Sequence, residues 1–184
     1  MWTLLWGEIM KKTTQLALCA ILIALALALS YTERMIPLQL LIPLPGIKLG
    51  LANIVTLIAL YLQGPKTAFT VLVLRCIMGS FFGGGLTGLA FSLTGGLLSM
   101  TVMVLTKRLP CFSVYGVSIL GAAFHNVGQI AAAMALMQTV YVASYLPYLL
   151  MVALLTGFAT GCAGAGILRV LSAVPAFTFP KANR

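Results

Sequence analysis

The chain is a succession of long apolar stretches separated by short breaks that contain glycine, proline or charged residues. A membrane-crossing helix needs about 20 predominantly apolar residues; four of the six stretches approach or exceed that length, and the other two are shorter. The approximate bounds of all six are Thr14–Tyr31, Lys48–Leu62, Lys66–Met78, Leu86–Thr106, Ser113–Gln138 and Leu149–Leu171. The connection from Thr32 to Gly46 contains three prolines, which make it too irregular to span. This pattern predicts an all-α membrane protein of six transmembrane helices.

The six stretches leave little of the chain for other structure. We expect residues 1–13 to form a cytoplasmic or interfacial segment, residues 14–172 the transmembrane domain, and residues 173–184 a cytoplasmic tail. The sequence Met10-Lys-Lys resembles a translation start, so the sequence leaves open whether residues 1–9 belong to the native protein. The first apolar stretch also resembles a signal peptide, but the spans that follow it favour a retained helix.

The composition agrees with this reading. Hydrophobic residues make up 61% of the chain and charged residues only 7%, whereas a soluble domain carries roughly 25% charged residues. So few charges cannot solvate the surface of a chain of 184 residues. The composition therefore excludes an ordinary soluble globular protein and leaves no room for a separate soluble domain.

The distribution of lysine and arginine predicts the orientation, since cytoplasmic loops of membrane proteins carry an excess of both. Eight of these residues fall on one side of the predicted membrane: Lys11, Lys12, Lys66, Lys107, Arg108, Arg169, Lys181 and Arg184. Arg34 and Lys48 fall on the other side, and Arg75 lies inside a span. We therefore expect a multi-pass protein of the cell membrane with both termini in the cytoplasm. Topology explains most of the net charge of +9, so no nucleic-acid partner is predicted.

The acidic residues exclude most catalytic chemistry. The chain contains no aspartate, and its two acidic residues are Glu8 and Glu33. No carboxylate pair, no Asp-rich magnesium site and no Ser-His-Asp triad can therefore form. His125 is the single histidine, and the cysteines at positions 19, 76, 111 and 162 lie too far apart for a metal motif. We expect a protein that is not an enzyme and that has no catalytic residue, metal or cofactor of its own.

Polar residues inside the predicted spans are the candidate functional residues, because polar groups within a membrane are costly. Arg75 lies about 13 Å along its helix from Lys66, near the middle of the bilayer. The polar residues at overlapping depths in the outer half are Lys48, Asn53, Arg75, His125, Asn126 and Gln129. They predict a net-positive pocket that binds an anionic or polar small molecule from the outer side.

Four of these residues also have a structural interpretation. Lys48 suits the membrane interface, and Arg75 suits a structural role in binding carbonyl groups at a helix end. His125 and Gln129 suit a hydrogen-bonded clamp between helices. Glu33 is the only nearby acid, and the span bounds place it in the outer loop. The glycine-rich run Phe81–Gly85 and three loop tyrosines, Tyr141, Tyr145 and Tyr148, suit either a lid or an interfacial aromatic belt.

Small residues repeat along two of the predicted spans and favour close helix packing. Ala20, Ala24 and Ala28 follow one face of the first span. A second stripe of small residues on the last span consists of Ala153, Gly157, Gly161 and Ala165. Such stripes serve packing within the bundle or docking of a partner helix.

Several motifs together resemble a known membrane family. They are Pro45-Gly-Ile-Lys-Leu-Gly-Leu-Ala-Asn-Ile54, Gly64-Pro65, Arg75 and Phe81-Phe-Gly-Gly-Gly85. The resemblance covers about residues 14–172. It points to the family called Gx transporter, also labelled heptaprenyl diphosphate synthase component I. That family is similar to the substrate-binding S components of energy-coupling factor (ECF) vitamin importers.

The resemblance implies a six-helix bundle with both termini inside and a ligand pocket that opens outward. S components carry an Ala-x-x-x-Ala motif on their first helix, which here corresponds to Ala20, Ala24 and Ala28. This motif docks onto a transmembrane coupling subunit, and separate ATPase subunits supply energy. On this reading the chain is the substrate-binding subunit of an ECF-type importer.

The label of the family implies a different function. Prenyl-chain elongation requires aspartate-rich motifs that hold Mg²⁺ against a diphosphate, and this chain has none. The alternative is therefore an accessory membrane subunit of heptaprenyl diphosphate synthase that works with an Asp-rich partner in isoprenoid or quinone biosynthesis. A third alternative is a membrane subunit of flavin- or quinone-linked electron transfer. The sequence leaves the ligand and the oligomeric state open.

Overall fold

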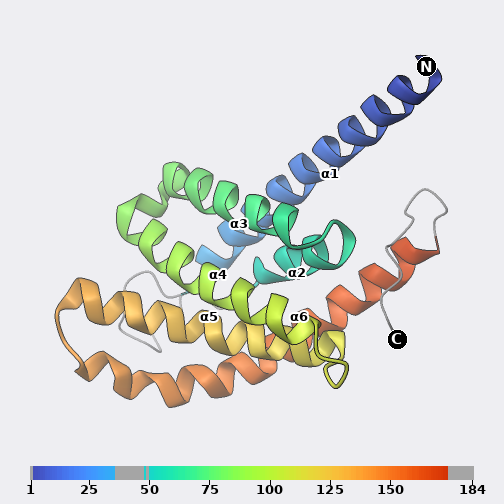
Figure 1. The fold of residues 1–184 in the computed structure, drawn as a ribbon. Coiled ribbons are helices and arrows are strands. Elements are labelled where there is room, and N and C mark those ends of the chain that lie inside the picture. The colour runs from blue at the N-terminus through green and yellow to red at the C-terminus, as the bar shows by residue number, and fades with distance from the viewer. Residues whose placement is uncertain (1, 36–47, 49, 174–184) are drawn as a thin grey trace.

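A computed structural model of the protein describes residues 2–35, 48 and 50–173 and contains six α-helices within that part (Figure 1). The α-helices are α1 (Trp2–Arg34), α2 (Asn53–Leu62), α3 (Pro65–Gly79), α4 (Gly85–Lys107), α5 (Val114–Met137) and α6 (Leu146–Ser172). A π-helical turn, η2 (Ser80–Gly84), joins α3 to α4, and a 3-10 helix, η3 (Tyr141–Tyr145), precedes α6. Most of the predicted proline-rich connection and the predicted tail lie outside the described residues. The all-α prediction is confirmed for the described chain.

Local sequence signals set several helix ends. Gly64 has a φ of +88°, which favours glycine, and Pro65 then occupies the first turn of α3, where its missing N–H costs nothing. The side chain of Ser113 accepts a hydrogen bond from Gly116 N and caps the start of α5. Gln138 ends α5 in a left-handed conformation with φ of 51°. The predicted breaks at these positions are confirmed.

The break predicted at Phe81–Gly85 is the reversal between α3 and α4. Phe82 and Gly83 leave helical geometry there, with Gly83 at φ of 95°. Without this break the segment Pro65–Lys107 would be a continuous apolar helix of 43 residues. The glycine-rich sequence instead folds the segment into two helices that contact each other.

The second predicted span, Lys48–Leu62, differs from the helix observed. Helix α2 has 10 residues, which corresponds to about 15 Å, roughly half of the hydrocarbon thickness. Gly50, with φ of +82°, stands in the non-helical stretch just before it. Nearly all of α2 is buried, so its apolar composition reflects a place in the core of the bundle rather than contact with lipid.

Four segments of the described chain are long and apolar enough to cross a membrane. They are Thr13–Glu33, Pro65–Lys107, Val114–Met137 and Tyr141–Leu171. The structure therefore supports a membrane protein with four candidate spanning segments, one of which is the α3–α4 pair. Helix α1 is longer than predicted, and its N-terminal part extends beyond the other helices (Figure 1).

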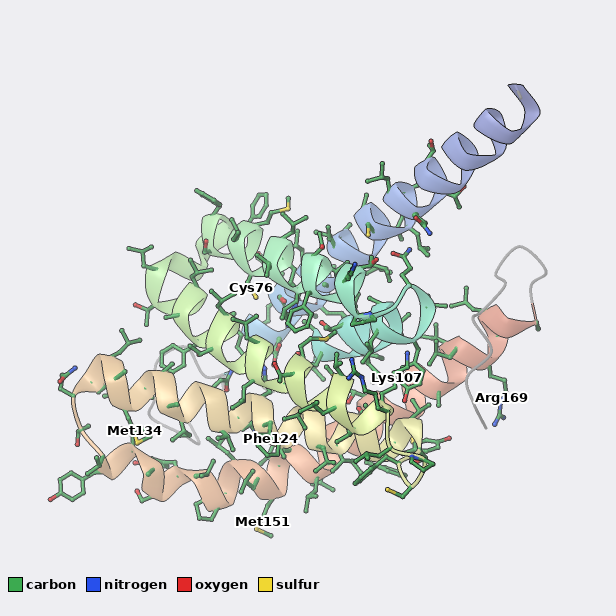
Figure 2. The ribbon with its side chains drawn as sticks, in the orientation of Figure 1. Cys76, Lys107, Phe124, Met134, Met151 and Arg169 are labelled. Carbon is green, nitrogen blue, oxygen red and sulfur yellow. The ribbon has the colours of Figure 1, made fainter. Side chains whose placement is uncertain are left out.

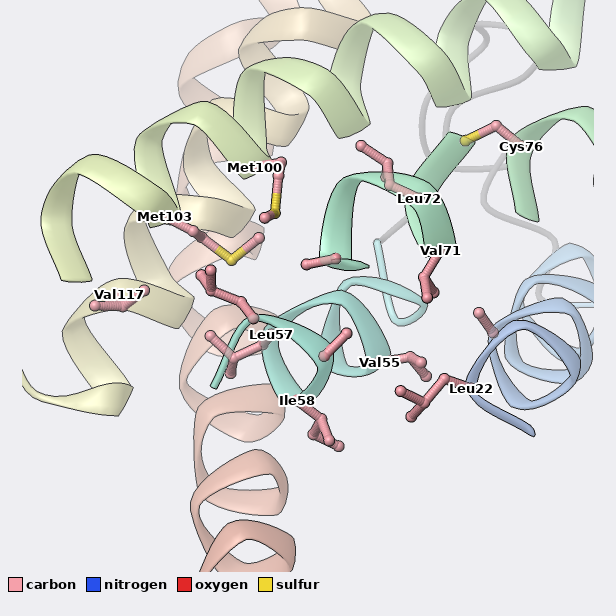
Figure 3. Packing of buried hydrophobic residues seen from close by; sticks show 14 residues of the cluster. Leu22, Val55, Leu57, Ile58, Val71, Leu72, Cys76, Met100, Met103 and Val117 are labelled. Carbon is pink, nitrogen blue, oxygen red and sulfur yellow. The ribbon is translucent and has the colours of Figure 1, made fainter. Parts of the chain in front are cut away.

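The core lies around α2, with side chains from α1, α3, α4 and α5 packed on it (Figure 3). Leu22 of α1, Leu72 of α3 and Met103 of α4 all have 5% or less of their surface exposed. A second cluster joins α4, α5 and α6 around Phe91 and Ile130. Large apolar side chains also cover the outside, and Met151 on α6 points away from the bundle with 69% of its surface exposed (Figure 2). Such a surface suits lipid.

Helices α4, α5 and α6 approach each other closely because small residues line their contacts. A Cβ atom on Gly128 would lie only 2.7 Å from Gly95 Cα, so the backbones of α5 and α4 nearly touch. A Cβ atom on Gly157 would lie 2.7 Å from Ile119 Cα on α5. Ser118 and Thr160 share a hydrogen bond of 3.0 Å. The small-residue stripe predicted on the last span therefore packs within the bundle.

One end of the bundle is basic. Lys107, in the last turn of α4, donates to the Leu60 carbonyl at 2.9 Å and lies 4.4 Å from the centre of the Tyr61 ring. The end of α2 therefore lies beside the end of α4, close to the start of α3. Lys107 and Arg169 both lie on the right-hand side of the view, toward the end where α1 begins (Figure 2).

Candidate functional site

A polar pocket lies between α1, α3 and α4, away from the basic end. Its lining residues are Ser30, Lys48, Arg75, Cys76, Gly79, Ser80, Gly88 and Ser92. Because serine and glycine side chains are small, they leave an open space in the pocket, and Lys48 and Arg75 form part of its wall. About 10 Å³ is open to a water-sized molecule, which is room for about one water. The pocket is therefore a narrow site with two cationic groups in its wall.

Lys48 lies between α4 and α5, just before α2. Its ammonium group donates to Ser92 Oγ at 2.6 Å. Its backbone meets Gln129 of α5: the amide of Gln129 accepts from Lys48 N at 3.2 Å and donates to Lys48 O at 3.1 Å. The same amide oxygen accepts from His125 Nε2 at 3.1 Å. Gln129 and His125 therefore hold the backbone from which the Lys48 side chain reaches the pocket.

Arg75 is the second cation of the pocket, and only 6% of its surface is exposed. One guanidinium nitrogen, Nη2, donates to Asn53 Oδ1 at 3.2 Å, and Asn53 Nδ2 donates in turn to Ser99 Oγ at 3.5 Å. Arg75 Nε is buried without a hydrogen-bond partner. A buried donor of this kind is costly unless a ligand or water accepts from it. Asn53 therefore positions Arg75, and Arg75 retains a donor for another group.

Glu33 corrects one expectation from the sequence. It was expected in the outer loop, but α1 continues through it, and its side chain is 2% exposed. Its carboxylate accepts a hydrogen bond from the backbone of Gly50 and interacts with the charges of Lys48 and Arg75. The physical reason is compensation, because two buried cations favour an acid nearby. Two cations and one acid meet here, so the site is net positive.

His125 is held on both sides by glycines. A Cβ on Gly50 would lie 3.1 Å from His125 Cδ2, and one on Gly95 would lie 3.0 Å from His125 Nδ1. The imidazole ring therefore fills the space between the turn before α2 and helix α4. His125 and Gln129 do not line the pocket, so their contacts are those of a clamp that joins α5 to Lys48.

Asn126 lies apart from the other predicted site residues. Its amide nitrogen donates to the Leu149 carbonyl at 2.8 Å, so it joins α5 to α6. The three loop tyrosines lie on η3 and α6, and none lines the polar pocket. The structure thus brings together Lys48, Asn53, Arg75, His125 and Gln129, and it turns Asn126 away.

The alanine stripe of α1 faces outward. Ala20, Ala24 and Ala28 are exposed, whereas Leu22 and Ala26 on the opposite side are buried against the bundle. The stripe is therefore available to another helix.

The serines of the pocket were not predicted from the sequence. Ser92 and Gly88 lie four residues apart on one face of α4, and Ser80 follows the end of α3. The sequence feature that could have revealed this part of the pocket is the pair of small residues, Gly88 and Ser92, at helical spacing next to the span that contains Arg75. Together the cations, serines and unpartnered Arg75 Nε suit an anionic oxygen ligand. Among the described residues, no group of three or more metal-ligating side chains comes together.

Comparison with known proteins identifies the family of the chain. The family described as heptaprenyl diphosphate synthase component I matches residues 22–167. Because this match covers most of the sequence, the chain belongs to that family, and the family resemblance noted from the motifs is confirmed. No curated protein and no solved structure matches the chain.

Proposed function

We propose that the chain is a membrane-embedded, non-catalytic subunit of a heptaprenyl diphosphate synthase, and that its basic pocket binds the diphosphate of a prenyl diphosphate. The observation that carries this proposal is Arg75, a buried guanidinium with an unsatisfied Nε beside the Lys48 ammonium. Two cations with serine hydroxyls suit phosphate oxygens, which accept several charge-assisted hydrogen bonds. The family to which the chain belongs supports a prenyl diphosphate in particular.

The proposal requires a partner. Chain elongation needs carboxylates that hold Mg²⁺ against the diphosphate, and this chain contains no aspartate. A separate Asp-rich subunit would therefore perform the reaction, and this chain would bind and present the lipid substrate at the membrane. The chain itself would contribute charge and position, with no metal or redox cofactor of its own.

The proposed topology has six crossings of the plasma membrane, with residues 1–13 and 173–184 in the cytoplasm. The basic end supports this orientation, because Lys66, Lys107 and Arg169 lie at helix ends that would face the cytoplasm. Helix α2 would complete the second crossing together with the stretch before it. An impermeant maleimide should then label exposed Cys111 only in inside-out vesicles.

A second candidate function is the substrate-binding subunit of an ECF-type importer. Two observations favour it. First, the pocket lies away from the basic end of the bundle, so under the proposed topology it opens outward. Second, the alanine stripe at Ala20, Ala24 and Ala28 is exposed, so a coupling subunit can dock on it. Under this alternative the ligand is an anionic or polar small molecule taken up from outside.

One purification distinguishes these functions. The full-length protein is expressed with its genomic neighbours, extracted in mild detergent and studied by native mass spectrometry. A bound prenyl diphosphate and an Asp-rich subunit whose activity rises with this chain would support the synthase. Coupling and ATPase subunits with a water-soluble ligand would support the importer and overturn the first proposal. A bound flavin or quinone would overturn both.

A further inference from the structure

A second cavity adjoins the polar pocket. It has a volume of about 500 Å³ and is lined by Leu27, Ala28, Ser30, Tyr31, Gly79 and Phe82. Ligand sites for small molecules commonly have volumes of about 300–1,000 Å³. Apart from the hydroxyl groups of Ser30 and Tyr31, its side chains are apolar. This cavity, which we call the apolar groove, lies between the end of α1 and the reversal at η2.

The apolar groove and the polar pocket are neighbours. Ser30 and Gly79 line both of them. Ser30 lies in the last turns of α1, and Gly79, which has no side chain, is the last residue of α3. The site as a whole is therefore cationic at one end and apolar at the other.

The apolar groove opens to the outer surface of the bundle. Tyr31 is 59% exposed and Phe82 is 66% exposed, and both lie at the ends of apolar helices. In a membrane protein such a surface meets lipid. A hydrocarbon chain that reaches the apolar groove from the bilayer therefore lies next to the pocket that Arg75 lines.

We propose that the apolar groove holds the isoprenoid chain of a prenyl diphosphate while Lys48 and Arg75 hold its diphosphate. This inference rests on the proposed function and adds that the substrate enters sideways from the membrane. Charge complementarity favours an anionic head group, because Lys48 and Arg75 outnumber the single acid, Glu33. The position of the apolar groove beside the polar pocket, with Ser30 and Gly79 in both walls, favours an amphiphile over a free anion.

The polar pocket must widen to admit the head group. It has room for about one water, so the side chains around it must move apart to admit a diphosphate, and the Lys48 ammonium then exchanges Ser92 for the ligand. The backbone of Lys48 can stay in place during this exchange, because Gln129 holds it separately. The isoprenoid chain then contributes binding through buried apolar surface at about 25 cal/mol per Å².

The test uses the full-length protein in phosphatidylcholine nanodiscs and two probes, farnesyl diphosphate and inorganic diphosphate. Ala28→Trp places an indole in the apolar groove at an exposed position that should not disturb folding. Ala24→Trp, on the same face one turn away and outside the groove, is the matched control. We expect Ala28→Trp to weaken farnesyl diphosphate binding at least tenfold and to leave inorganic diphosphate binding unchanged. Ala24→Trp should change neither.

The outcomes separate this inference from the proposed function. If Ala28→Trp leaves farnesyl diphosphate binding intact while Arg75→Gln weakens binding of both probes roughly a hundredfold, the head-group site stands and the inference about the apolar groove is wrong. If neither probe binds the wild-type protein, the proposed function itself fails. A photoreactive farnesyl diphosphate should crosslink within Leu27–Tyr31 or at Phe82. Equal competition by dioleoyl phosphatidylglycerol would identify an ordinary lipid contact and overturn the inference.

Discussion

The Lys48 ammonium group donates a 2.6 Å hydrogen bond to Ser92 Oγ, which joins the stretch before α2 to the N-terminal half of α4. This bond closes the polar pocket on one side, while Arg75 borders it on the other. Lys48 is thus positioned by α5 through its backbone and by α4 through its side chain. A ligand in the pocket competes with Ser92 for the ammonium group.

The first prediction concerns a substitution, Ser92→Ala, that removes this competition. Ser92→Ala should bind inorganic diphosphate about fivefold more tightly, because a typical hydrogen bond contributes about 1 kcal/mol that the ligand no longer has to displace. Isothermal titration calorimetry on the detergent-purified protein measures the change. Ser118→Ala, which loses the bond to Thr160 on α6, is the control and should leave binding unchanged. Weaker binding by Ser92→Ala would mean that Ser92 contacts the ligand directly.

The second prediction concerns the buried guanidinium. Arg75→Gln should lower diphosphate affinity by roughly a hundredfold, or 2.7 kcal/mol, because a buried charge-assisted contact is lost. Arg75→Lys keeps the charge but loses the planar set of donors, so it should restore only part of the affinity. Lys66→Gln on the same helix is exposed and serves as the matched control. Equal losses in Arg75→Gln and Lys66→Gln would contradict a site at Arg75.

The third prediction changes the charge of the site. Glu33→Gln keeps a side-chain oxygen as acceptor for the Gly50 N–H but removes the negative charge near Lys48 and Arg75. Diphosphate binding should strengthen by roughly tenfold, or 1.4 kcal/mol. Titrations at increasing NaCl should show that wild type and variant both weaken with salt. Weaker binding by Glu33→Gln at every salt concentration would instead indicate that the carboxylate is required for the shape of the site.

The fourth prediction separates the two polar residues of α5. Gln129→Met leaves the Lys48 backbone and His125 Nε2 unpaired, so it should lower stability by about 1–3 kcal/mol and also weaken diphosphate binding. Asn126→Leu removes the bond to the Leu149 carbonyl. It should lower stability by a similar amount without changing the affinity of the folded protein. Thermal unfolding and calorimetry on the same preparations distinguish the two variants. A loss of affinity in Asn126→Leu would contradict the placement of Asn126 outside the ligand site.

The fifth prediction tests the contact between α4 and α5. Gly128→Ala should destabilise the protein by about 1–3 kcal/mol, because the added methyl group meets the backbone of Gly95 and Thr94 at 2.7 Å. Gly166→Ala on α6 has nothing within 4 Å of the new atom. It should stabilise its helix by up to about 1 kcal/mol through helix propensity. Thermal unfolding in one detergent compares the two, and equal effects would contradict the close approach.

Hydrophobic periodicity and turn residues predicted most of the helices. The ends at Gly64-Pro65, Ser113 and Phe81–Gly85 depend on local backbone chemistry, which is why the sequence revealed them. The length of α2 could not be predicted, because an apolar run of this size is compatible with a span and with a buried half-length helix. The distinction depends on which neighbours surround it.

The candidate site was predicted in part. Lys48, Asn53 and Arg75 were identified because polar residues stand out in apolar spans. Glu33 was misplaced because the end of α1 was set too early, by the proline-rich connection that follows. The direction of Asn126 toward α6 depends on helix rotation, which spacing alone does not fix when both faces of α5 are buried.

Ala28 belongs both to the exposed stripe of α1 and to the wall of the apolar groove. A helix docked on the stripe and a hydrocarbon chain in the apolar groove would therefore occupy the same atoms of surface. Two such ligands are linked thermodynamically, and each must lower the affinity for the other by the same factor. Docking of a partner helix would then release the hydrocarbon chain from the apolar groove, and a hydrocarbon chain that returned to the groove would release the partner helix. These are two directions of one equilibrium.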